Sequence, residues 1–467
     1  MAKKRPLLGL VLLAFIACMA HSQQFDDEKD FAVQVNKNQN TVVITSYKGK
    51  NKRVRIPLKI QGMPIVEIGY RAFQSKQLES VAMPDSVTKI GNEAFSRNQL
   101  TSVRISRGLT SIGSKAFEDN KLDKIAIPDN VTVIGSEAFV KNNLASVIIG
   151  KSVASIGNRA FADNKLSSVI IPEKVTSVEG RIFAGNPLTA LSVDAGNTAL
   201  SVKDFFLLSR DGRKLFMCWG DEKSITNVTI PNNVTSIGVK AFDGFKITSL
   251  TIPNNVAIIG GGAFDGNRLT SVTIPNNVTF IGDKAFNNNQ LSAVTIGPSV
   301  TSIGSGAFAR NQLTSVAIPN SVTSIGEGAF ESNKLTNIVI PNNITSIAKS
   351  AFMNNQIGSV TIGSSVASIG DKAFSKNQIT SVEIPNSVTL IGIGAFEENR
   401  LTAVTIPSGV SVGNYAFDKN QMNRVVMGAK VEIDTNSFPG DFASLYFTQT
   451  KTEGTYTFIN GKWNKGR

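Results

Sequence analysis

Apolar and polar positions alternate and then spread apart within a short segment that recurs along the chain. In residues 269–290 the apolar residues alternate with polar ones around Val272 and Ile274. This period-two pattern predicts a short strand at 271–274 with two side chains facing inward. Pro275 cannot donate to a ladder, and the asparagines after it tolerate turn geometry. We therefore expect the strand to end there.

The rest of the segment predicts a return path to the next strand. Residues 278–282, "VTFIG", form a second short extended piece. It ends at Gly282, where the absence of Cβ permits either positive φ or a close approach of backbone. Residues 283–286, "DKAF", predict a turn or one irregular helical turn. Phe286 would fill the interior of the coil, and Ala285 is small enough to lie against the neighbouring coil.

Phenylalanine marks each recurrence, at a step of 22 residues that shortens to 21 at the end. The positions are Phe73, Phe95, Phe117, Phe139, Phe161 and Phe183, then Phe242, Phe264, Phe286, Phe308, Phe330, Phe352, Phe374, Phe396, Phe417 and Phe438. A fixed period of roughly 20–50 residues predicts a solenoid or a propeller, because each unit must be covered by the next. Asparagine follows most of these rings by three residues, as at Asn289, and we expect it to bond the backbone of the bend.

The period breaks once, between Phe183 and Phe242, which lie 59 residues apart. Residues 205–218, "FFLLSRDGRKLFMC", place two apolar runs around Asp211 and Gly212, a strong hairpin signal. This hairpin is either a tolerated insertion that covers adjoining coils or a bend or partner site. The expected divisions are a signal peptide at 1–22, an N-terminal cap at 23–66, a repeat arm at 67–187, an irregular segment at 188–224, a second arm at 225–438 and a C-terminal cap at 439–467.

The two ends predict export and capping. A basic start followed by an apolar run over 7–17 is typical of a secretory signal. Cleavage after Ala20 or Ser22 would release a soluble chain, whereas cleavage before Cys18 would leave a lipid tether. At the far end, residues 443–467 predict alternating short strands with a turn at Asn460 and Gly461, covering the last coil.

The repeat "LTSVxIPxxVTSIGxxAFxxN" resembles the BspA-type class of bacterial leucine-rich repeats over residues 42–438, and residues 42–73 resemble its capping unit. Period alone leaves open a parallel β-helix, whose coils have a similar length. The resemblance implies an α/β, β-rich, right-handed leucine-rich-repeat solenoid, with a parallel β-sheet on one face and short strands and irregular or 3₁₀ turns on the other. It also implies a surface adhesin that binds host matrix proteins or other bacteria.

Chemistry-bearing residues are scarce. The only histidine, His21, lies at the signal boundary, which argues against histidine-dependent catalysis and zinc sites. A carboxylate pair on the strand face would serve polysaccharide cleavage, but the outward column there holds one acid, Glu383. Cys218 is the one cysteine certain to remain after export, so no internal disulfide is expected and the thiol should be buried. We expect no enzyme activity, no metal and no cofactor.

The strand face instead offers an extended surface of small hydroxyl and methyl groups. The candidate partner-binding residues on it are Ile148, Ile170, Thr229, Ser249, Thr251, Ser271, Thr273, Thr295, Thr361, Glu383 and Thr405. Serine and threonine also suit strand packing and solubility, so single positions carry little weight.

Charge adds a second candidate surface. The net charge of +13 includes three signal residues, and 13 − 3 leaves +10 on the exported chain. This net positive charge favours binding to acidic glycans, anionic lipid headgroups or acidic proteins. The densest basic run is Lys48, Lys50, Lys52, Arg53 and Arg55, which are either solvated cap residues or a site. Nucleic acid is not an expected partner, because the chain is exported and no aromatic residues lie among these cations.

The sequence therefore predicts a secreted or surface-tethered binding protein. Its ligand would be a host matrix protein, another bacterial surface or an acidic glycan, held along the repeat surface. A noncatalytic scaffold protein of the bacterial envelope is the alternative. The sequence makes no prediction about oligomeric state.

Overall fold

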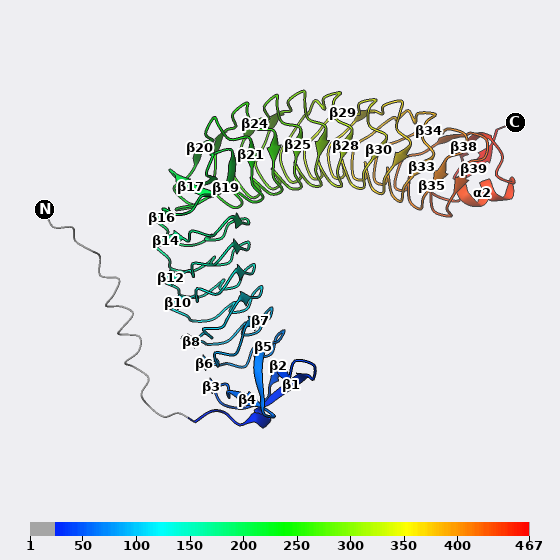
Figure 1. Cartoon of the computed structure of the whole chain (residues 1–467). Helices are drawn as coiled ribbons and strands as arrows, with labels where there is room; N and C mark the ends of the chain where they lie inside the picture. The colour runs from blue at the N-terminus through cyan, green and yellow to red at the C-terminus, as the bar shows by residue number, and fades with distance from the viewer. Residues whose placement is uncertain (1–23, 467) are drawn as a thin grey trace. The chain divides into compact units, whose positions relative to one another are not determined.

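The computed structural model describes residues 24–466 and divides into two compact units, unit 1 ending at Val153 and unit 2 beginning at Ala154. The predicted signal peptide, with Cys18 and His21, lies outside the described residues. Figure 1 labels the elements. In both units each coil contributes short strands to two parallel ladders, joined by turns. The fold is the predicted leucine-rich-repeat solenoid.

Unit 1 contains a terminal strand pair followed by coils. Its elements are η1 (Glu28–Asp30), β1 (Phe31–Asn36), β2 (Thr41–Tyr47), β3 (Arg53–Arg55), β4 (Lys59–Ile60), β5 (Met63–Ile68), β6 (Ser80–Ala82), β7 (Lys89–Ile90), β8 (Ser102–Arg104), β9 (Ser111–Ile112), β10 (Lys124–Ala126), β11 (Val133–Ile134) and β12 (Ser146–Ile148). β1 pairs antiparallel with β2, which then runs parallel to β5 and so leads into the ladder β5-β7-β9-β11. β3-β6-β8 and β10-β12 form the other ladder.

Unit 2 repeats the two ladders over many coils. Its elements are β13 (Ser155–Ile156), β14 (Ser168–Ile171), β15 (Ser177–Val178), β16 (Ala190–Val193), β17 (Leu200–Lys203), β18 (Phe206–Ser209), β19 (Lys214–Cys218), β20 (Asn227–Thr229), β21 (Ser236–Ile237), β22 (Ser249–Thr251), β23 (Ile258–Ile259), β24 (Ser271–Thr273), β25 (Phe280–Ile281), β26 (Ala293–Thr295), β27 (Ser302–Ile303), β28 (Ser324–Ile325), β29 (Asn337–Val339), β30 (Ser346–Ile347), β31 (Ser359–Thr361), β32 (Ser368–Ile369), β33 (Leu390–Ile391), β34 (Ala403–Ile406), β35 (Ser411–Val412), β36 (Arg424–Met427), β37 (Glu432–Ile433), α2 (Phe442–Thr448), β38 (Gly454–Ile459) and β39 (Lys462–Lys465). We call the strands that pair as β3-β6-β8, β10-β12, β14-β16, β20-β22, β24-β26, β29-β31 and β34-β36 the long ladder. We call the strands that pair as β5-β7-β9-β11, β13-β15, β19-β21-β23-β25-β27-β28 and β30-β32-β33-β35-β37 the short ladder.

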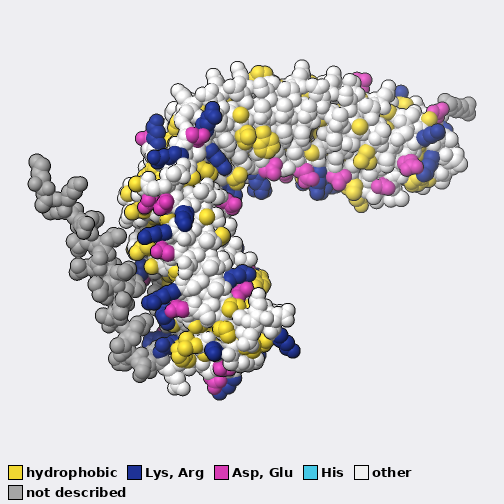
Figure 2. Space-filling view, in the orientation of Figure 1, with side chains coloured by type: hydrophobic (Ala, Val, Ile, Leu, Met, Phe, Trp, Pro, Cys, Tyr) yellow, Lys and Arg dark blue, Asp and Glu magenta, His cyan; other side chains and the backbone are white. Residues whose placement is uncertain are grey.

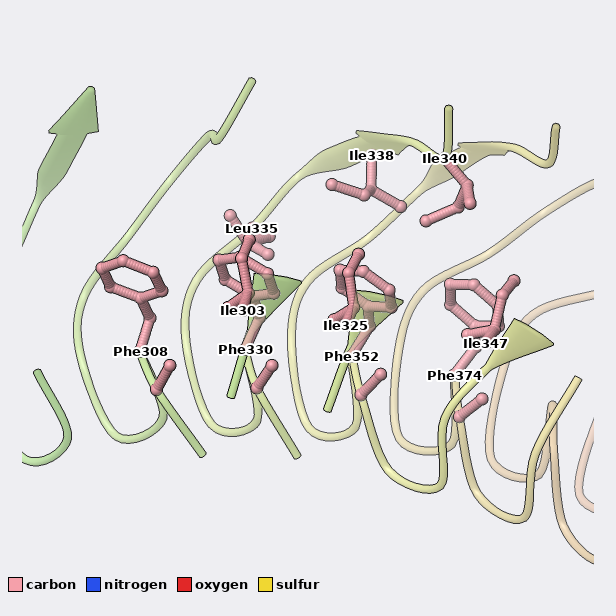
Figure 3. Packing of buried hydrophobic residues seen from close by; sticks show 14 of the residues in the cluster. Ile303, Phe308, Ile325, Phe330, Leu335, Ile338, Ile340, Ile347, Phe352 and Phe374 are labelled. Carbon is pink, nitrogen blue, oxygen red and sulfur yellow. The ribbon is translucent and has the colours of Figure 1, made fainter. Parts of the chain in front are cut away.

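The interior of the regular coils is a column of stacked phenylalanine rings. Phe308, Phe330, Phe352 and Phe374 point into their coils and lie parallel in Figure 3. Their centroids are 5.5, 5.6 and 5.5 Å apart, and all four side chains are fully buried. Offset stacking at this spacing is favourable beyond the area it buries. The predicted aromatic spine is confirmed.

The asparagine column bonds each bend to its neighbour. Asn289 is 7% exposed. Its Nδ2 donates to the carbonyl oxygens of Phe264 (2.9 Å) and Phe286 (3.2 Å), and its Oδ1 accepts from the N–H of Leu269 at 3.1 Å. The same arrangement recurs along the stack. The prediction that asparagine satisfies backbone groups of the bend is confirmed.

A glycine follows most of the short strands, and the close packing of coils requires it. A Cβ on Gly282 would lie 2.5 Å from the nitrogen of Gly261 and 2.7 Å from the carbonyl carbon of Gly260. Positive φ occurs two residues later, at Lys284, where φ is 55°. Of the two roles that the sequence left open for Gly282, the structure therefore supports close approach.

The predicted hairpin at the break in the period is confirmed as β18 and β19, whose turn contains Gly212 with φ of 72°. β17 adds a third antiparallel strand. β19 then runs parallel to β21, pairing Leu215 with Ile237. Phe206 and Leu208 are buried in the core of unit 2. The insertion thus joins the short ladder and is part of the stack.

The C-terminal cap differs from the prediction in one part. Residues 443–447, expected as a strand, lie in helix α2, because Phe442 and Tyr446 bury the same helical face at spacing i, i+4. The hydroxyl of Tyr446 donates to the carbonyl of Val431 at 3.0 Å. β38 and β39 are strands around Asn460, as expected, and β38 covers the edge of β36. Among residues 24–466, no helix combines the length and hydrophobicity needed to cross a bilayer.

Candidate partner-binding surfaces

The predicted strand face is the outer side of the long ladder. Nine of its candidate residues lie in unit 2, and all nine are exposed: Thr229, Ser249, Thr251, Ser271, Thr273, Thr295, Thr361, Glu383 and Thr405. Thr229 lies beside Thr251, and Thr273 beside Thr295, in parallel register. Glu383 lies outside the named strands, where only an isolated bridge joins Ser359 to Ser381. The face presents hydroxyl and methyl groups with little charge.

The two exposed isoleucines lie on different units. Ile148 ends β12 in unit 1 and is 61% exposed, whereas Ile170 lies in β14 of unit 2 and is 63% exposed. Each projects outward from its own strand, as the alternation predicts. We therefore treat them as two separate exposed side chains.

The basic patch lies at the start of unit 1, and several of its cations have partners within the fold. Arg53 forms an ion pair with Glu79 at 3.0 Å. The Lys52 ammonium donates to the carbonyl of Lys76 at 3.0 Å. The Arg55 guanidinium lies 5.0 Å from the centre of the Phe25 ring. Lys48 and Lys50 are exposed. The fold therefore uses part of this charge to hold the cap.

A buried ionic cluster sits where the insertion rejoins the stack. Arg181 is the only charged residue counted as buried among residues 24–466, at 6% exposed. Its guanidinium donates to the Glu222 carboxylate and to the Asp243 carbonyl oxygen, and lies 4.6 Å from the centre of the Phe245 ring. Desolvation lowers the pKa of Arg181, and the Glu222 charge opposes that shift. Sequence periodicity gave no signal for this pair, because it spans the irregular segment.

The thiol of Cys218 lies beside this cluster and is buried, as predicted. Burial raises the pKa of the Cys218 thiol well above its ordinary value. The space lined by Arg181, Cys218, Trp219 and Glu222 measures about 10 Å³. This volume holds no more than a single water molecule. The cluster therefore holds the insertion in place and offers no room for an organic ligand.

Within residues 24–466, no group of three or more histidine, cysteine, aspartate or glutamate side chains is arranged to hold a metal ion. The candidate functional features of the described residues are therefore exposed surfaces where a partner could bind.

A surface that the sequence reasoning missed runs along the glycines that end the short strands. We call it the glycine corner. Large hydrophobic side chains flank it on both sides and are 41–58% exposed: Tyr70 and Val133 in unit 1, and Val239, Ile258, Phe280, Leu390 and Ile393 in unit 2. Figure 2 shows hydrophobic side chains gathered on the surface of unit 2. The signal was present in the sequence as apolar residues two positions before a glycine, in a column otherwise rich in serine, or one position after it, in a column of mostly polar residues.

Two open depressions border the coil turns. In unit 1 a groove of about 480 Å³ follows the glycine corner and is lined by Glu67, Tyr70, Lys89, Asn92 and Val133 among others. In unit 2 a depression of about 410 Å³ lies over the next turn, where Gly306 and Gly328 leave space between Lys284 and Lys349. The first contains an exposed aromatic ring and the second does not.

Solved structures of bacterial leucine-rich-repeat proteins are similar to this chain. A leucine-rich cell surface protein of Faecalibacterium prausnitzii is 25% identical over 73% of this chain and 95% of its own, with a TM-score of 0.47. The pneumococcal vaccine antigen PcpA is 18% identical over 86% of this chain and 98% of its own, with a TM-score of 0.48. A leucine-rich-repeat protein of Eubacterium ventriosum is 22% identical over 81% and 95%, with a TM-score of 0.44.

No curated protein sequence matches this chain. The family profile for the BspA-type leucine-rich-repeat region, which contains six copies of the repeat, matches residues 66–189, 216–336 and 323–442. These matches span most of both units and contain the phenylalanine and asparagine columns described above. The chain belongs to the BspA-type leucine-rich-repeat family.

Proposed function

We propose that this protein is an exported, surface-located binding protein whose partner lies along the outer side of the long ladder in unit 2. The observation that carries the proposal is the set of exposed threonines at one position of four successive coils, with Thr229 paired in register to Thr251 and Thr273 to Thr295. The strands fix the backbone of these side chains, so a partner would meet a rigid surface and little conformational entropy would be lost on that side.

The partner classes that fit this surface are a host matrix protein, the surface of another bacterium or an acidic glycan. BspA-type proteins act as adhesins, which favours the first two. An acidic glycan would be attracted by the net positive charge of the chain, which is +13, or 13 − 3 = +10 after loss of the signal residues. Export rests on the signal at 1–22, with release as a soluble chain or attachment through a lipid on Cys18.

The test is binding of the exported chain to immobilised fibronectin, fibrinogen, heparin and whole bacterial cells by surface plasmon resonance. The variant Thr251→Arg, Thr273→Arg, Thr295→Arg places three long cations on the proposed face. For a protein or cell-surface partner we expect at least about a tenfold loss of affinity, because bulky charged groups would have to be desolvated against it. Added arginines would attract heparin, so for that probe the variant is Thr251→Glu, Thr273→Glu, Thr295→Glu, which should weaken binding through like-charge repulsion.

The chain offers a matched control for added charge. Gln290, Gln312 and Gln356 are exposed and occupy the position at which a neighbouring coil carries Arg268. The variant Gln290→Arg, Gln312→Arg, Gln356→Arg adds the same three charges away from the long-ladder face and should keep affinity within about twofold. Equal loss in both variants would contradict a site on the strand face.

A structural protein of the bacterial envelope is the alternative function. It is supported by coils that bind one another through extensive backbone hydrogen bonds and so form a rigid stack. Lack of saturable binding to every probe, together with envelope leakage on gene deletion, would support it over adhesion.

A further inference from the structure

The groove along the glycine corner of unit 1 is formed by four neighbouring coils. The outward residues of the short strands β5, β7, β9 and β11 stand side by side in parallel register, and in order they are Glu67, Lys89, Ser111 and Val133. On the opposite side of the glycines lie Tyr70, Asn92 and Ser114. At a strand spacing of about 4.8 Å the groove is roughly 14 Å long, which is room for a short chain of about three sugar rings.

The floor of this groove has no backbone groups to offer a ligand. The N–H of Gly113 donates to the carbonyl of Ile90 at 2.8 Å, and its own carbonyl accepts from Ala116 at 3.3 Å. Gly91 and Gly135 are bonded in the same way. An extended peptide that adds to a sheet edge needs unpaired N–H and C=O groups. Recognition here must therefore come from the side chains on the two rims.

The aromatic ring at the end of the groove is exposed and held in position. Tyr70 is 58% exposed. The Arg71 guanidinium lies 4.7 Å from the ring centre. Arg71 in turn forms two hydrogen bonds to Glu93, at 2.8 and 3.1 Å, and Gln74 donates to the same carboxylate at 2.9 Å. One face of the ring is thus backed by a fixed cation, and the ring is preorganised for a flat ligand on its other side.

The remaining rim groups are polar and their charges cancel. Lys89 forms an ion pair with Glu67 at 3.1 Å, so the pair adds no net charge. Asn92 accepts the N–H of Ser114 at 2.9 Å through Oδ1, which aims its amide group along the groove wall. Ser111 supplies a hydroxyl. The lining therefore combines one aromatic ring, an apolar Val133 that is 44% exposed, and several hydrogen-bonding groups without a net field.

We propose that this groove binds an uncharged glycan chain, with a sugar ring stacked on Tyr70 and its hydroxyl groups bonded to Glu67, Lys89 and Asn92. Sugar rings present an apolar face of C–H groups and a rim of hydroxyls, which matches an aromatic ring beside neutral polar groups. The site lies on a different surface from the long-ladder face, so it stands whether or not that face binds a protein. A polyanionic glycan would gain nothing from the balanced Glu67–Lys89 pair.

The test is isothermal titration of the full-length exported chain with maltohexaose, cellohexaose and chitohexaose, and with a heparin hexasaccharide as the polyanionic comparison. We expect saturable binding of at least one neutral hexasaccharide. Tyr70→Ala should weaken it by about tenfold or more, whereas Tyr70→Phe keeps the ring and should change affinity by less than about threefold.

A second pair of variants addresses the groove independently of the tyrosine. Ser111→Arg places a long side chain across its middle and should abolish binding. Ser102→Arg makes the same change on β8 of the long ladder, where the side chain is exposed, and should leave it unchanged. Circular dichroism would confirm that all variants remain folded.

Three results would overturn the proposal: no binding of any neutral hexasaccharide up to about 10 mM, binding of heparin alone, or equal effects of Ser111→Arg and Ser102→Arg. Failure of the long-ladder proposal is recognised separately. In that case the Thr251→Arg, Thr273→Arg, Thr295→Arg variant would bind matrix proteins as tightly as the unchanged chain, while the sugar titrations would still show binding at the Tyr70 groove.

Discussion

The asparagine column allows a sharp test of what holds successive coils together. Replacing Asn289 with alanine removes a side chain that is 7% exposed. The N–H of Leu269 and the carbonyl oxygen of Phe264 each have Asn289 as their hydrogen-bond partner, at 3.1 and 2.9 Å. The carbonyl of Phe286 keeps a bond from Asn311 at 2.9 Å. The substitution therefore leaves two buried backbone groups unpaired.

Each unpaired buried group costs about 1–3 kcal/mol, so the total loss is on the order of 3 kcal/mol. Because coils of a repeat protein can open locally, the appropriate measurement is native-state hydrogen exchange by mass spectrometry over residues 268–296. A loss of about 3 kcal/mol corresponds to exchange roughly 150-fold faster for amides that exchange through local opening. Amides of distant coils should change much less.

Asn287 is the matched control, because it lies on the same coil and makes one side-chain bond, to the Asp265 carboxylate at 2.8 Å. Asn287→Ala should cost about 1 kcal/mol or less. Equal acceleration in the two variants, or a change below about threefold in Asn289→Ala, would refute the reasoning that this column supplies backbone bonds that nothing else can make.

Three further predictions concern the core and the insertion. Phe286→Ala should lower the stability of its coils by about 3–5 kcal/mol through a cavity in the ring column, measured by urea denaturation; a loss below about 1 kcal/mol would contradict the packing. Cys218 should resist iodoacetamide at pH 8 in the folded protein and react in urea, because burial raises the pKa of its thiol and keeps the thiolate scarce; rapid native labelling would show that it is accessible. Arg181→Leu should cost about 2 kcal/mol by tryptophan-fluorescence melting, since Glu222 would lose its cation while remaining partly hydrated. The double variant with Glu222→Leu should recover part of that loss, and no recovery would argue against the pair.

Much of the fold follows from the sequence because each coil repeats the same residues at the positions that determine its strands and turns. Phe286, Asn289 and Pro275 have counterparts at the same position of most other coils, so many copies of the pattern support each predicted element. The role of Gly282 could not be chosen from sequence, since positive φ and close approach both require a missing Cβ and only the distance to the next coil distinguishes them.

Features that occur once were harder to predict. The segment that forms helix α2 predicts a strand, because Tyr446 and its neighbours form a short apolar run that no repeat copies, and so its period is ambiguous. The Arg181–Glu222 pair joins residues 41 positions apart across an irregular segment, and no spacing rule connects them. The Tyr70 groove could not be predicted from the repeat, because Tyr70 and Val133 occur at positions that hold polar residues in most other coils and only the stacked coils bring them to one surface.

The close glycine contacts have a consequence for how such a chain changes its length. Each coil meets both neighbours through the same backbone atoms, with Gly282 against Gly261 and Gly304 against Asp283. Insertion or deletion of one whole repeat among the glycine-bearing coils therefore recreates the same kind of junction, whereas a gain or loss of a few residues shifts all contacts on one side. Gene duplication within the tract can lengthen the molecule stepwise without redesign of any interior surface.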